Sequence, residues 1–326
     1  MAVRVAINGF GRIGRTVLRA WATRGAWPDI EIALVNDIAA PETCAYLFEY
    51  DSVFGPFPGP VRLEEGHLVL PGARPRLTRT PDLSTLDLSG IDVVMECTGR
   101  AETVEVAGRG LAAGAGRVLV SGPSPAAGIT VVLGANDAAL EPGHRIVSNA
   151  SCTTNALAPL ARRLDEGFGI EAGWMTTIHC YTGSQPTVDA PGATPERSRA
   201  AALSMVPTTT SASRLLDRVL PQLAGRIEGA AVRVPTASVS AVDLTVLPRR
   251  PVGAEEVRAL LSGAGGVIGT TDRPLVSTDL RARPESVVMA LGETRVTAAG
   301  LVRVFGWYDN EWGFSCRMLD MAARMG

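Results

Sequence analysis

The hydrophobic positions in the first half of the chain form short apolar runs that are separated by stretches with helical spacing. The apolar runs predict buried strands over residues 3–7, 30–35, 91–95 and 118–121. The stretches between them predict helices over residues 11–23, 41–48 and 102–113. Strands that alternate with helices are typical of an α/β fold with a doubly wound, Rossmann-type parallel sheet.

The pattern changes after about residue 150. Apolar and polar positions alternate over 231–234 and 238–247, which predicts strands of a mixed or antiparallel sheet and hence a second, α+β domain. The apolar residues of 181–207 follow neither the helical nor the strand period, which predicts a long loop. A loop of this length inside a compact domain is usually functional. A last strand over 302–307 precedes a helix over 311–325.

The composition excludes several classes of protein. The chain has 326 residues, enough for about two domains. Its formal net charge is −2 and it has no basic cluster, so we expect no nucleic-acid or membrane partner. No stretch approaches the roughly 18 apolar residues of a membrane span, and the first residues lack the apolar core of a signal peptide. The sequence contains no lysine, which excludes lysine Schiff-base enzymes and Walker-type kinases.

Cysteine usage indicates a reducing compartment. The five cysteines are odd in number and show no Cys-x-x-Cys spacing, which argues against a disulfide framework or a zinc site. We therefore expect a cytoplasmic protein without a bound metal.

Residues 9–14 match the glycine pattern of a dinucleotide-binding turn, between a predicted strand and a predicted helix. Gly9 allows the tight turn, Gly11 lets a pyrophosphate approach the backbone, and Gly14 allows close packing of helix on strand. Asp37 follows at the end of the second strand, where a carboxylate accepts hydrogen bonds from the adenosine ribose and repels a 2′-phosphate. The alternative for Asp37 is a turn residue that caps the next helix. The order of these features favours dinucleotide binding, and the Asp37 carboxylate favours NAD over NADP.

The segment Ser148–Asn155 carries the strongest candidate for catalysis. Ser151 is a good helix N-cap, so we expect Cys152 in the first turn of a helix. At that position N–H groups and the helix dipole favour an anion, which is expected to lower the pKa of the thiol. The alternative is a small buried hydrophobic residue, because most free cysteines are simply packed.

Several segments in order along the chain resemble the phosphorylating glyceraldehyde-3-phosphate dehydrogenases. They are Ile7–Arg15, Asn36–Asp37, Glu96–Gly99, Ser148–Asn155, Thr176–Thr182, Arg233–Thr236 and Trp307–Gly313. With this resemblance we expect an NAD-binding domain over residues 1–151, completed by a C-terminal helix over 314–326. The catalytic domain is then expected over residues 152–313. The resemblance also implies a homotetramer.

The chemistry implied by the resemblance starts with a thiolate. Oxidation of an aldehyde by NAD first needs a tetrahedral carbon that can donate a hydride, and addition of the Cys152 sulfur to the carbonyl provides it. His179 is expected to take the thiol proton, to support the oxyanion and to take a proton as hydride leaves. Inorganic phosphate then attacks the thioester, so the enzyme needs two anion sites.

By resemblance, each anion and the cofactor receive their own set of residues. Those expected to hold inorganic phosphate are Ser151, Thr153, Arg197, Thr210 and Ser211; those for the substrate phosphate are Thr182 and Arg233. Arginine suits both sites because its planar fork donates two hydrogen bonds to an oxyanion. The residues expected at NAD are Gly9, Phe10, Gly11, Arg12, Ile13, Gly14, Asp37, Arg79, Thr98, Gly99, Ser121 and Asn310, the last at the nicotinamide carboxamide.

The chain departs from the family pattern at several positions. Ala156 replaces a second cysteine that relatives often carry four residues after the nucleophile, so Cys152 cannot form a disulfide there. Ser211 stands where relatives carry glycine, and a side chain there crowds the phosphate pocket if the backbone is close to the anion. Other departures are Ser184, Arg214, Phe314, Phe54 and Ala101.

We expect oxidation of D-glyceraldehyde 3-phosphate to 1,3-bisphosphoglycerate with NAD, through a thiohemiacetal and a thioester on Cys152. Two alternatives stay open. The same mechanism could act on another phosphorylated aldehyde, such as erythrose 4-phosphate. A protein of another class, a diverged nucleotide-binding regulator, could retain the dinucleotide pocket without useful turnover, although the presence of both Cys152 and His179 argues against it.

Overall fold

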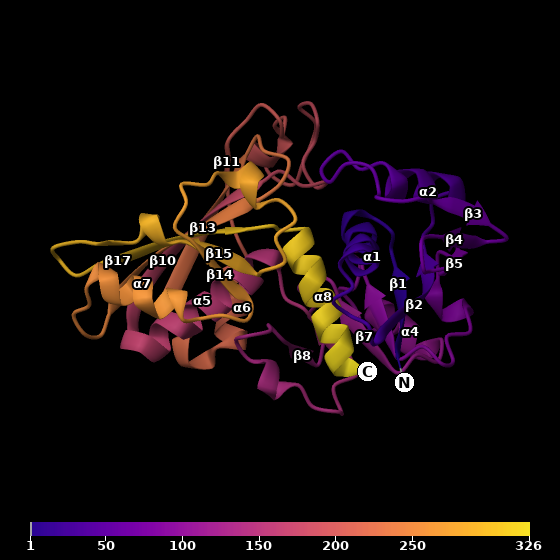
Figure 1. Cartoon of the computed structure of the whole chain (residues 1–326), viewed down its shortest axis with the longest axis horizontal. Helices are drawn as coiled ribbons and strands as arrows, with labels where there is room; N and C mark the ends of the chain where they lie inside the picture. The colour runs from indigo at the N-terminus through magenta and orange to yellow at the C-terminus, as the bar shows by residue number, and fades with distance from the viewer. Residues whose placement is uncertain (1) are drawn as a thin grey trace. The chain divides into compact units, whose positions relative to one another are not determined.

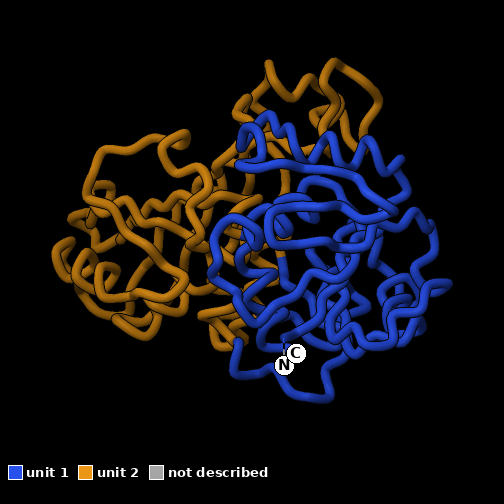
Figure 2. The backbone as a smooth tube through the Cα atoms, turned by 45° about the vertical axis from the view of Figure 1, so that its right-hand side comes forward, with its two compact units in different colours: residues 1–131, 137–150, 314–326 blue, residues 132–136, 151–313 orange. Residues whose placement is uncertain are grey.

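The computed structural model describes residues 2–326, which form two compact units. The first unit consists of residues up to Val131, Asp137–Ala150 and Phe314–Gly326, and the second of Val132–Asn136 and Ser151–Gly313. Figure 2 colours the first unit blue and the second orange.

The first unit contains a nine-stranded sheet. Its strands, from one edge to the other, are β3 (Arg62–Glu64), β4 (His67–Val69), β5 (Arg76–Thr78), β2 (Ile30–Asn36), β1 (Val3–Asn8), β6 (Val93–Glu96), β7 (Arg117–Val120), β9 (Ile146–Ser148) and β8 (Ile129–Thr130). Pairing is parallel from β5 through to β8, whereas β3, β4 and β5 pair antiparallel. The predicted parallel sheet is therefore confirmed, with an added antiparallel edge.

The helices of the first unit connect these strands, except for the last one, which ends the chain. They are α1 (Arg12–Arg24), α2 (Pro41–Glu49), α3 (Val104–Ala107), α4 (Arg109–Ala112) and most of α8 (Trp312–Met325), with 3₁₀ turns η1 (Leu83–Thr85) and η2 (Asp137–Ala139). The helical stretch predicted over 102–113 is confirmed as two short helices, because Gly108 ends α3 and precedes α4. A Cβ at Gly108 would lie 2.8 Å from the Val104 carbonyl oxygen of α3, so glycine suits the position where that helix ends.

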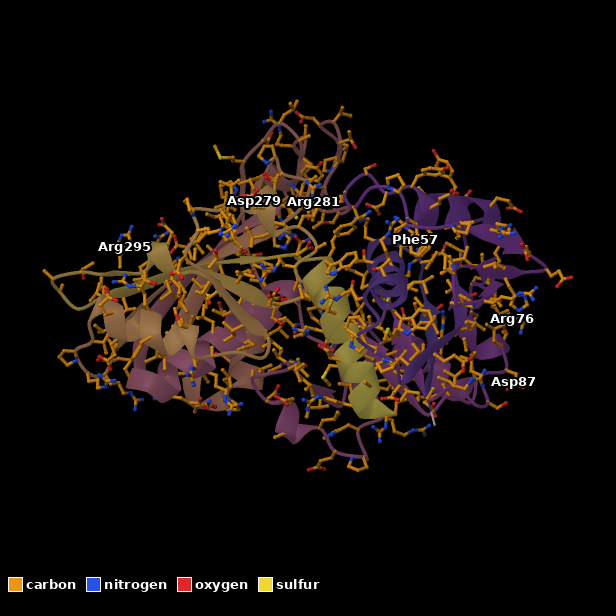
Figure 3. The ribbon with its side chains drawn as sticks, in the orientation of Figure 1. Phe57, Arg76, Asp87, Asp279, Arg281 and Arg295 are labelled. Carbon is orange, nitrogen blue, oxygen red and sulfur yellow. The ribbon has the colours of Figure 1, made fainter. Side chains whose placement is uncertain are left out.

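An aromatic cluster supports the turn between β1 and α1. Phe10 follows Gly9 and is 2% exposed, with its ring 5.9 Å from that of Phe48. Phe57, which is labelled in Figure 3, lies 4.9 Å from Phe48 on the same chain of contacts. The Arg19 guanidinium lies over the Phe48 and Phe57 rings and donates a hydrogen bond to the Phe48 carbonyl oxygen. The turn is thus held by aromatic packing as well as by its glycines.

The second unit contains an eight-stranded mixed sheet (Figure 1). Its main path is β11 (Val206–Thr208), β12 (Ile227–Val234), β10 (Ile170–Cys180), β13 (Ser240–Pro248), β17 (Val302–Tyr308), β15 (Val287–Ala290) and β14 (Ile268–Thr271), and β16 (Arg295–Val296) pairs with β17. Only β10 with β12 and β14 with β15 pair in parallel. The prediction of a mixed sheet after residue 150 is confirmed.

The helices α5 (Cys152–Phe168), α6 (Ala212–Val219) and α7 (Ala254–Ser262) pack against this sheet. The remaining regular elements are 3₁₀ turns, η3 (Glu196–Ser198), η4 (Pro221–Leu223), η5 (Ser277–Leu280) and η6 (Leu291–Glu293). The stretch 181–207 is irregular as expected, apart from η3 and the start of β11. It leads from the end of β10, which carries His179, toward the start of α6.

Candidate active site

Cys152 is the first residue of α5, as the sequence predicts. The Ser151 side chain caps the helix by accepting a hydrogen bond from the Thr154 N–H at 3.1 Å. Ala150, immediately before the cap, has φ 55°, a left-handed conformation that residues with a Cβ rarely adopt. Strained backbone of this kind is often found at functional sites, and here it turns the chain directly into the helix that carries the thiol.

His179 lies beside Cys152. It is near the end of β10, is 5% exposed, and its Nε2 lies 3.5 Å from the Cys152 Sγ. The two residues are brought together because β10 is central in the sheet and α5 packs against it. A thiol and an imidazole at this distance can exchange a proton directly.

The protonation of this pair differs from the prediction. Burial raises the pKa of the Cys152 thiol above its ordinary value, and this effect exceeds the lowering caused by Arg233 and by hydrogen bonds at the start of α5. The expected low thiol pKa is therefore wrong for this arrangement, because the cost of burying a charged sulfur was not visible in the sequence. Burial and the Arg233 charge lower the pKa of His179 to about 4. Both directions favour the uncharged thiol and the uncharged imidazole over an ion pair of the two groups.

Arg233 contacts the other side of His179. The two residues are register partners on the parallel strands β12 and β10. The Arg233 Nη1 lies 2.6 Å from His179 Nδ1 and donates to the Cys180 carbonyl oxygen at 3.0 Å. That same oxygen is 2.7 Å from His179 Nδ1.

Tyr308, a residue that the sequence reasoning did not single out, joins the elements of the site. Its hydroxyl lies 2.9 Å from the Thr153 hydroxyl and 2.7 Å from that of Thr177, and its ring packs edge-on to His179 at 6.0 Å. Tyr308 belongs to the Trp307–Gly313 segment that resembles the family, and its place in that segment is the sequence feature that could have indicated a role at the site. The bridge fixes α5, β10 and β17 relative to one another.

A pocket of about 700 Å³ opens beside Cys152 and His179. Three of its lining residues are arginines, and Glu228 is the one acidic residue among them. The predicted phosphate-site residues that line it are Ser151, Thr153, Arg197, Thr210, Ser211 and Arg233. Arg214, which stands where relatives carry lysine, lines it too. A pocket with this excess of guanidinium groups favours a multiply charged oxyanion.

The rim of this pocket is built at the start of α6. The Thr210 hydroxyl accepts from the Ala212 N–H at 3.1 Å, and Ser211 is the residue before the helix, with φ −83°. Ser211 therefore occupies an ordinary backbone conformation that does not require glycine. Arg197 donates through Nε to the Thr208 hydroxyl at 2.8 Å.

Two further predicted residues lie elsewhere in the second unit. Thr182 shares a hydrogen bond with Ser184 at 3.0 Å and does not line the pocket beside Cys152. Asn310 is 7% exposed, and its Oδ1 accepts from the Cys180 thiol at 3.1 Å and from the Ser240 hydroxyl at 3.2 Å. Because both neighbours donate to the amide oxygen, the amide of Asn310 is held in one orientation, with its N–H₂ group available to another acceptor.

The first unit has a pocket of its own, of about 280 Å³, at the carboxyl ends of β1, β2 and β6. The glycines behave there as predicted. Gly9 has φ 92°, and a Cβ at Gly14 would lie 2.1 Å from the Gly9 carbonyl oxygen. A Cβ at Gly11 would meet nothing within 4 Å; Gly11 lines the pocket, so its backbone is open to a ligand there. The N-terminus of α1 begins at the next residue, which is the arrangement that binds a diphosphate.

Asp37 lines the same pocket. Its carboxylate accepts from the Phe10 N–H at 2.6 Å and from the Ala39 N–H at 2.8 Å, so it supports both the glycine turn and the turn before α2. Each carboxylate oxygen keeps an acceptor site for a ribose hydroxyl. The two interpretations of Asp37 are thus compatible.

The other residues predicted at the cofactor differ in how close they lie to this pocket. Thr98 lines it and is bound to buried Glu96 through its N–H and its hydroxyl. Gly99 follows with φ 70°. Arg79 donates to the Ile38 carbonyl oxygen at 2.9 Å, and Ser121 lies directly after β7. Arg12 and Ile13 begin α1, and the Arg12 side chain pairs with Asp51 at 2.5 Å.

Comparison with known proteins decides the family. Residues 3–104 match the family model described as glyceraldehyde 3-phosphate dehydrogenase, NAD binding domain, and residues 151–310 match that of the C-terminal domain. The chain belongs to the glyceraldehyde-3-phosphate dehydrogenase family.

Individual relatives carry the same name. A glyceraldehyde-3-phosphate dehydrogenase from Xanthobacter flavus is 48% identical, over all of this chain and 99% of the relative. One from Cereibacter sphaeroides is 46% identical, again over all of this chain and 99% of the relative. One from Geobacillus stearothermophilus is 43% identical over 99% of this chain and 98% of the relative. The likeness therefore covers both units.

Most residues at which the chain departs from the family pattern are buried. Ala156 and Ala101 are buried, as is Phe314. The Phe54 ring lies 5.6 Å from the Arg12 guanidinium. Within residues 2–326 there is no group of histidine, cysteine and acidic side chains that could hold a metal ion. Over the same residues, every helix is too short or too polar to cross a membrane.

Proposed function

We propose that this protein oxidises D-glyceraldehyde 3-phosphate to 1,3-bisphosphoglycerate with NAD and inorganic phosphate. The observation that carries the proposal is the pairing of Cys152 with His179 at 3.5 Å on the wall of a pocket rich in arginine. A nucleophile, a base and anion-binding groups in one place suit an acyl transfer to phosphate. Family membership supports the same conclusion.

The first step is addition of the Cys152 sulfur to the aldehyde carbon, which gives a thiohemiacetal. The thiol proton leaves to the neutral imidazole of His179, and the carbonyl oxygen becomes the hydroxyl of the adduct after it gains a proton. A His179 pKa of about 4 keeps the imidazole unprotonated and ready to act at neutral pH. The imidazolium formed in the step is then placed to donate to the oxyanion.

The first unit fits NAD. Gly11 leaves room for a pyrophosphate against the backbone, the α1 N-terminus favours its charge, and Asp37 has acceptor sites for the ribose. When bound, NAD supplies the acceptor for the hydride that leaves the thiohemiacetal carbon. The residues proposed to hold it are Gly9, Phe10, Gly11, Arg12, Ile13, Gly14, Asp37, Arg79, Thr98, Gly99, Ser121 and Asn310.

Loss of hydride and of the hydroxyl proton leaves a thioester on Cys152, with His179 taking the proton. Inorganic phosphate then attacks the thioester carbon, the bond to sulfur breaks, and the acyl phosphate leaves. We assign the attacking phosphate to the pocket lined by Ser151, Thr153, Arg197, Thr210 and Ser211, and the substrate phosphate to Arg233 with Thr182. Positive charge at both places lowers the cost of bringing two anions together.

The test is a steady-state assay of purified protein with two aldehydes, glyceraldehyde 3-phosphate and erythrose 4-phosphate, each with and without inorganic phosphate. We expect NADH formation with the first aldehyde that depends on phosphate and a much lower kcat/KM with the second. Equal or greater efficiency with erythrose 4-phosphate would overturn the substrate assignment. Absence of turnover with both, in protein that binds NAD, would favour a regulator.

The protein is further proposed to be a cytoplasmic homotetramer. Apolar side chains exposed on the second unit support self-association: Trp174 and Ile178 on β10 are 51% and 37% exposed, and Leu203 and Met205 are 84% and 74% exposed. The five cysteines are all free, as in a reducing compartment. Light scattering of the purified protein measures the assembly, and a monomer at micromolar concentration would contradict it.

A further inference from the structure

Three neighbouring strands of the second unit each bring a polar side chain to one place. Cys180 ends β10, Ser240 begins the adjacent strand β13, and Asn310 lies two residues after β17, which pairs with β13. All three residues are buried, with exposed fractions of 1%, 1% and 7%. Their hydrogen bonds therefore form away from bulk water, where a polar group without a partner is costly.

Both acceptor sites of the Asn310 amide oxygen are occupied. The Cys180 thiol donates to Oδ1 at 3.1 Å, and the Ser240 hydroxyl donates to it at 3.2 Å. The Ser240 oxygen itself accepts from the Cys180 N–H at 3.1 Å, so the single hydroxyl proton is left for Asn310. Turning the amide over would deprive both the thiol and the hydroxyl of their acceptor.

Two further features keep these donors in place. Burial raises the pKa of the Cys180 thiol to about 12, so the thiol keeps its proton at neutral pH and remains a donor. Val239, directly before Ser240, has φ 66°, a left-handed conformation that is unusual for a β-branched residue. Backbone of this kind persists only where the surrounding structure fixes it, and it is often found at functional sites.

The N–H₂ group of Asn310 is the part of the amide that is left for a ligand. Within residues 2–326, no group accepts a hydrogen bond from Nδ2, although Asn310 is only 7% exposed. A nearly buried donor without a partner indicates an acceptor that is supplied from outside the chain. Asn310 thus offers N–H donors to a ligand and no free acceptor.

We propose that Cys180, together with Ser240, is a positioning residue: it fixes the Asn310 amide so that only N–H donors face the nicotinamide carboxamide of the cofactor. This inference deepens the proposed function, and it rests on the assignment of Asn310 to that carboxamide.

The fixed amide has a consequence for the half of the carboxamide that Asn310 can bind. A carboxamide offers an acceptor, its oxygen, and a donor, its N–H₂ group. Two N–H₂ groups that face each other repel, so only the oxygen of the carboxamide suits Asn310. Cys180 acts through Asn310 in this respect: without the thiol, one acceptor site of Oδ1 is free and the amide can turn over to face the N–H₂ group instead.

Two analogues of NAD separate the two halves of the carboxamide. The 3-acetylpyridine analogue keeps the carbonyl oxygen and has a methyl group in place of N–H₂. The thionicotinamide analogue keeps N–H₂ and has sulfur, a weak acceptor, in place of the oxygen. Calorimetric titration without aldehyde measures the dissociation constant of each. The wild-type protein is expected to bind the thionicotinamide analogue roughly 3- to 10-fold more weakly than the acetylpyridine analogue, the effect of about one hydrogen bond.

Removal of the thiol should remove this preference. In Cys180→Ala the two dissociation constants are expected to agree within about twofold, because either end of the amide can then face the ligand. Cys180→Ser keeps a donor and should restore the wild-type ratio. Cys180→Val fills more of the space without a donor, and it repeats the test if Cys180→Ala is unstable. Cys316→Ala, which removes a buried thiol of α8, is the control and should keep the wild-type ratio.

Equal affinity of the wild-type protein for the two analogues would overturn the inference, and so would a wild-type ratio in Cys180→Ala. A ratio in Cys180→Ser that follows the alanine variant would also overturn it, because the serine hydroxyl supplies the same donor. NADH formation from glyceraldehyde 3-phosphate by the same wild-type protein would leave the proposed function standing, so the two can fail separately. If neither NAD nor an analogue binds, the cofactor assignment fails and this inference fails with it.

Discussion

The Sγ atom of Cys152 and the Nε2 atom of His179 lie 3.5 Å apart, although the first belongs to a helix N-terminus and the second to the central strand β10. Tyr308 ties the two elements together through Thr153 and Thr177. The pair is therefore rigidly supported, as catalysis by a positioned base requires.

Cys152→Ser is expected to remove detectable dehydrogenase turnover and to leave NAD binding intact. A serine hydroxyl at this position has no base strong enough to make it a comparable nucleophile. The measurements are steady-state NADH formation and NAD binding by calorimetry. Cys44→Ala, which removes a buried cysteine of the first unit, serves as the control and should keep most activity. A rate near wild type for Cys152→Ser would refute the role of the thiol.

His179→Gln is expected to lower kcat by about 10²–10⁴-fold, the usual contribution of a general base. Glutamine fills similar space but cannot accept the thiol proton. His144→Gln, at a turn in the first unit, is the matched control and should behave as wild type. If single-turnover acylation proceeds equally fast in His179→Gln and wild type, another group must take the proton.

Stability should fall in acid because of His179. Its pKa is 6.5 in an unfolded chain and about 4 in the folded protein, so the unfolded state binds more protons between these values. The stabilisation is present above about pH 6.5 and is lost as the pH falls toward 4. Between pH 7 and pH 5 the loss from this group is about 2 kcal/mol. Denaturant unfolding of wild type and His179→Gln at pH 7 and pH 5 isolates the contribution of His179. An equal loss of unfolding free energy in the two proteins would contradict the lowered pKa of His179.

Asp37→Asn should raise the relative efficiency with NADP. The carboxylate repels a 2′-phosphate, and its neutral analogue does not, so the ratio of kcat/KM for NADP to that for NAD is expected to rise roughly tenfold, about 1.4 kcal/mol. Asp29→Asn, which neutralises an exposed carboxylate outside the pocket, is the control. An unchanged ratio would mean that Asp37 does not face the ribose.

Arg197→Gln is expected to raise the KM for inorganic phosphate roughly 10- to 100-fold, because a hydrogen bond to a charged group contributes about 1.5–3 kcal/mol. The KM for the aldehyde should change little, and the thioester should accumulate after one burst of NADH. Arg199→Gln removes an arginine of the same loop that pairs with Asp189 outside the pocket, and it should leave both constants unchanged. An effect of Arg197→Gln on aldehyde KM alone would reverse the assignment of the anion sites.

The sequence by itself determined the features that depend on neighbours along the chain. The glycine turn at 9–14, the Ser151 cap and the start of α5 at Cys152 follow from local backbone requirements, and the structure has each of them in place. The helical stretch over 102–113 was predicted too, but its division at Gly108 was not, because spacing along the chain does not reveal where the first helix ends.

Only the tertiary structure decided how distant residues act on one another. The parallel register of β10 and β12 places Arg233 beside His179, and no local pattern specifies a pairing between strands so far apart in sequence. The position of β17 in the sheet likewise places the Tyr308 hydroxyl between Thr153 and Thr177. The direction of the Cys152 pKa shift also belongs to this group: the helix N-terminus was readable from the sequence, but the degree of burial that outweighs it exists only once the second unit has folded.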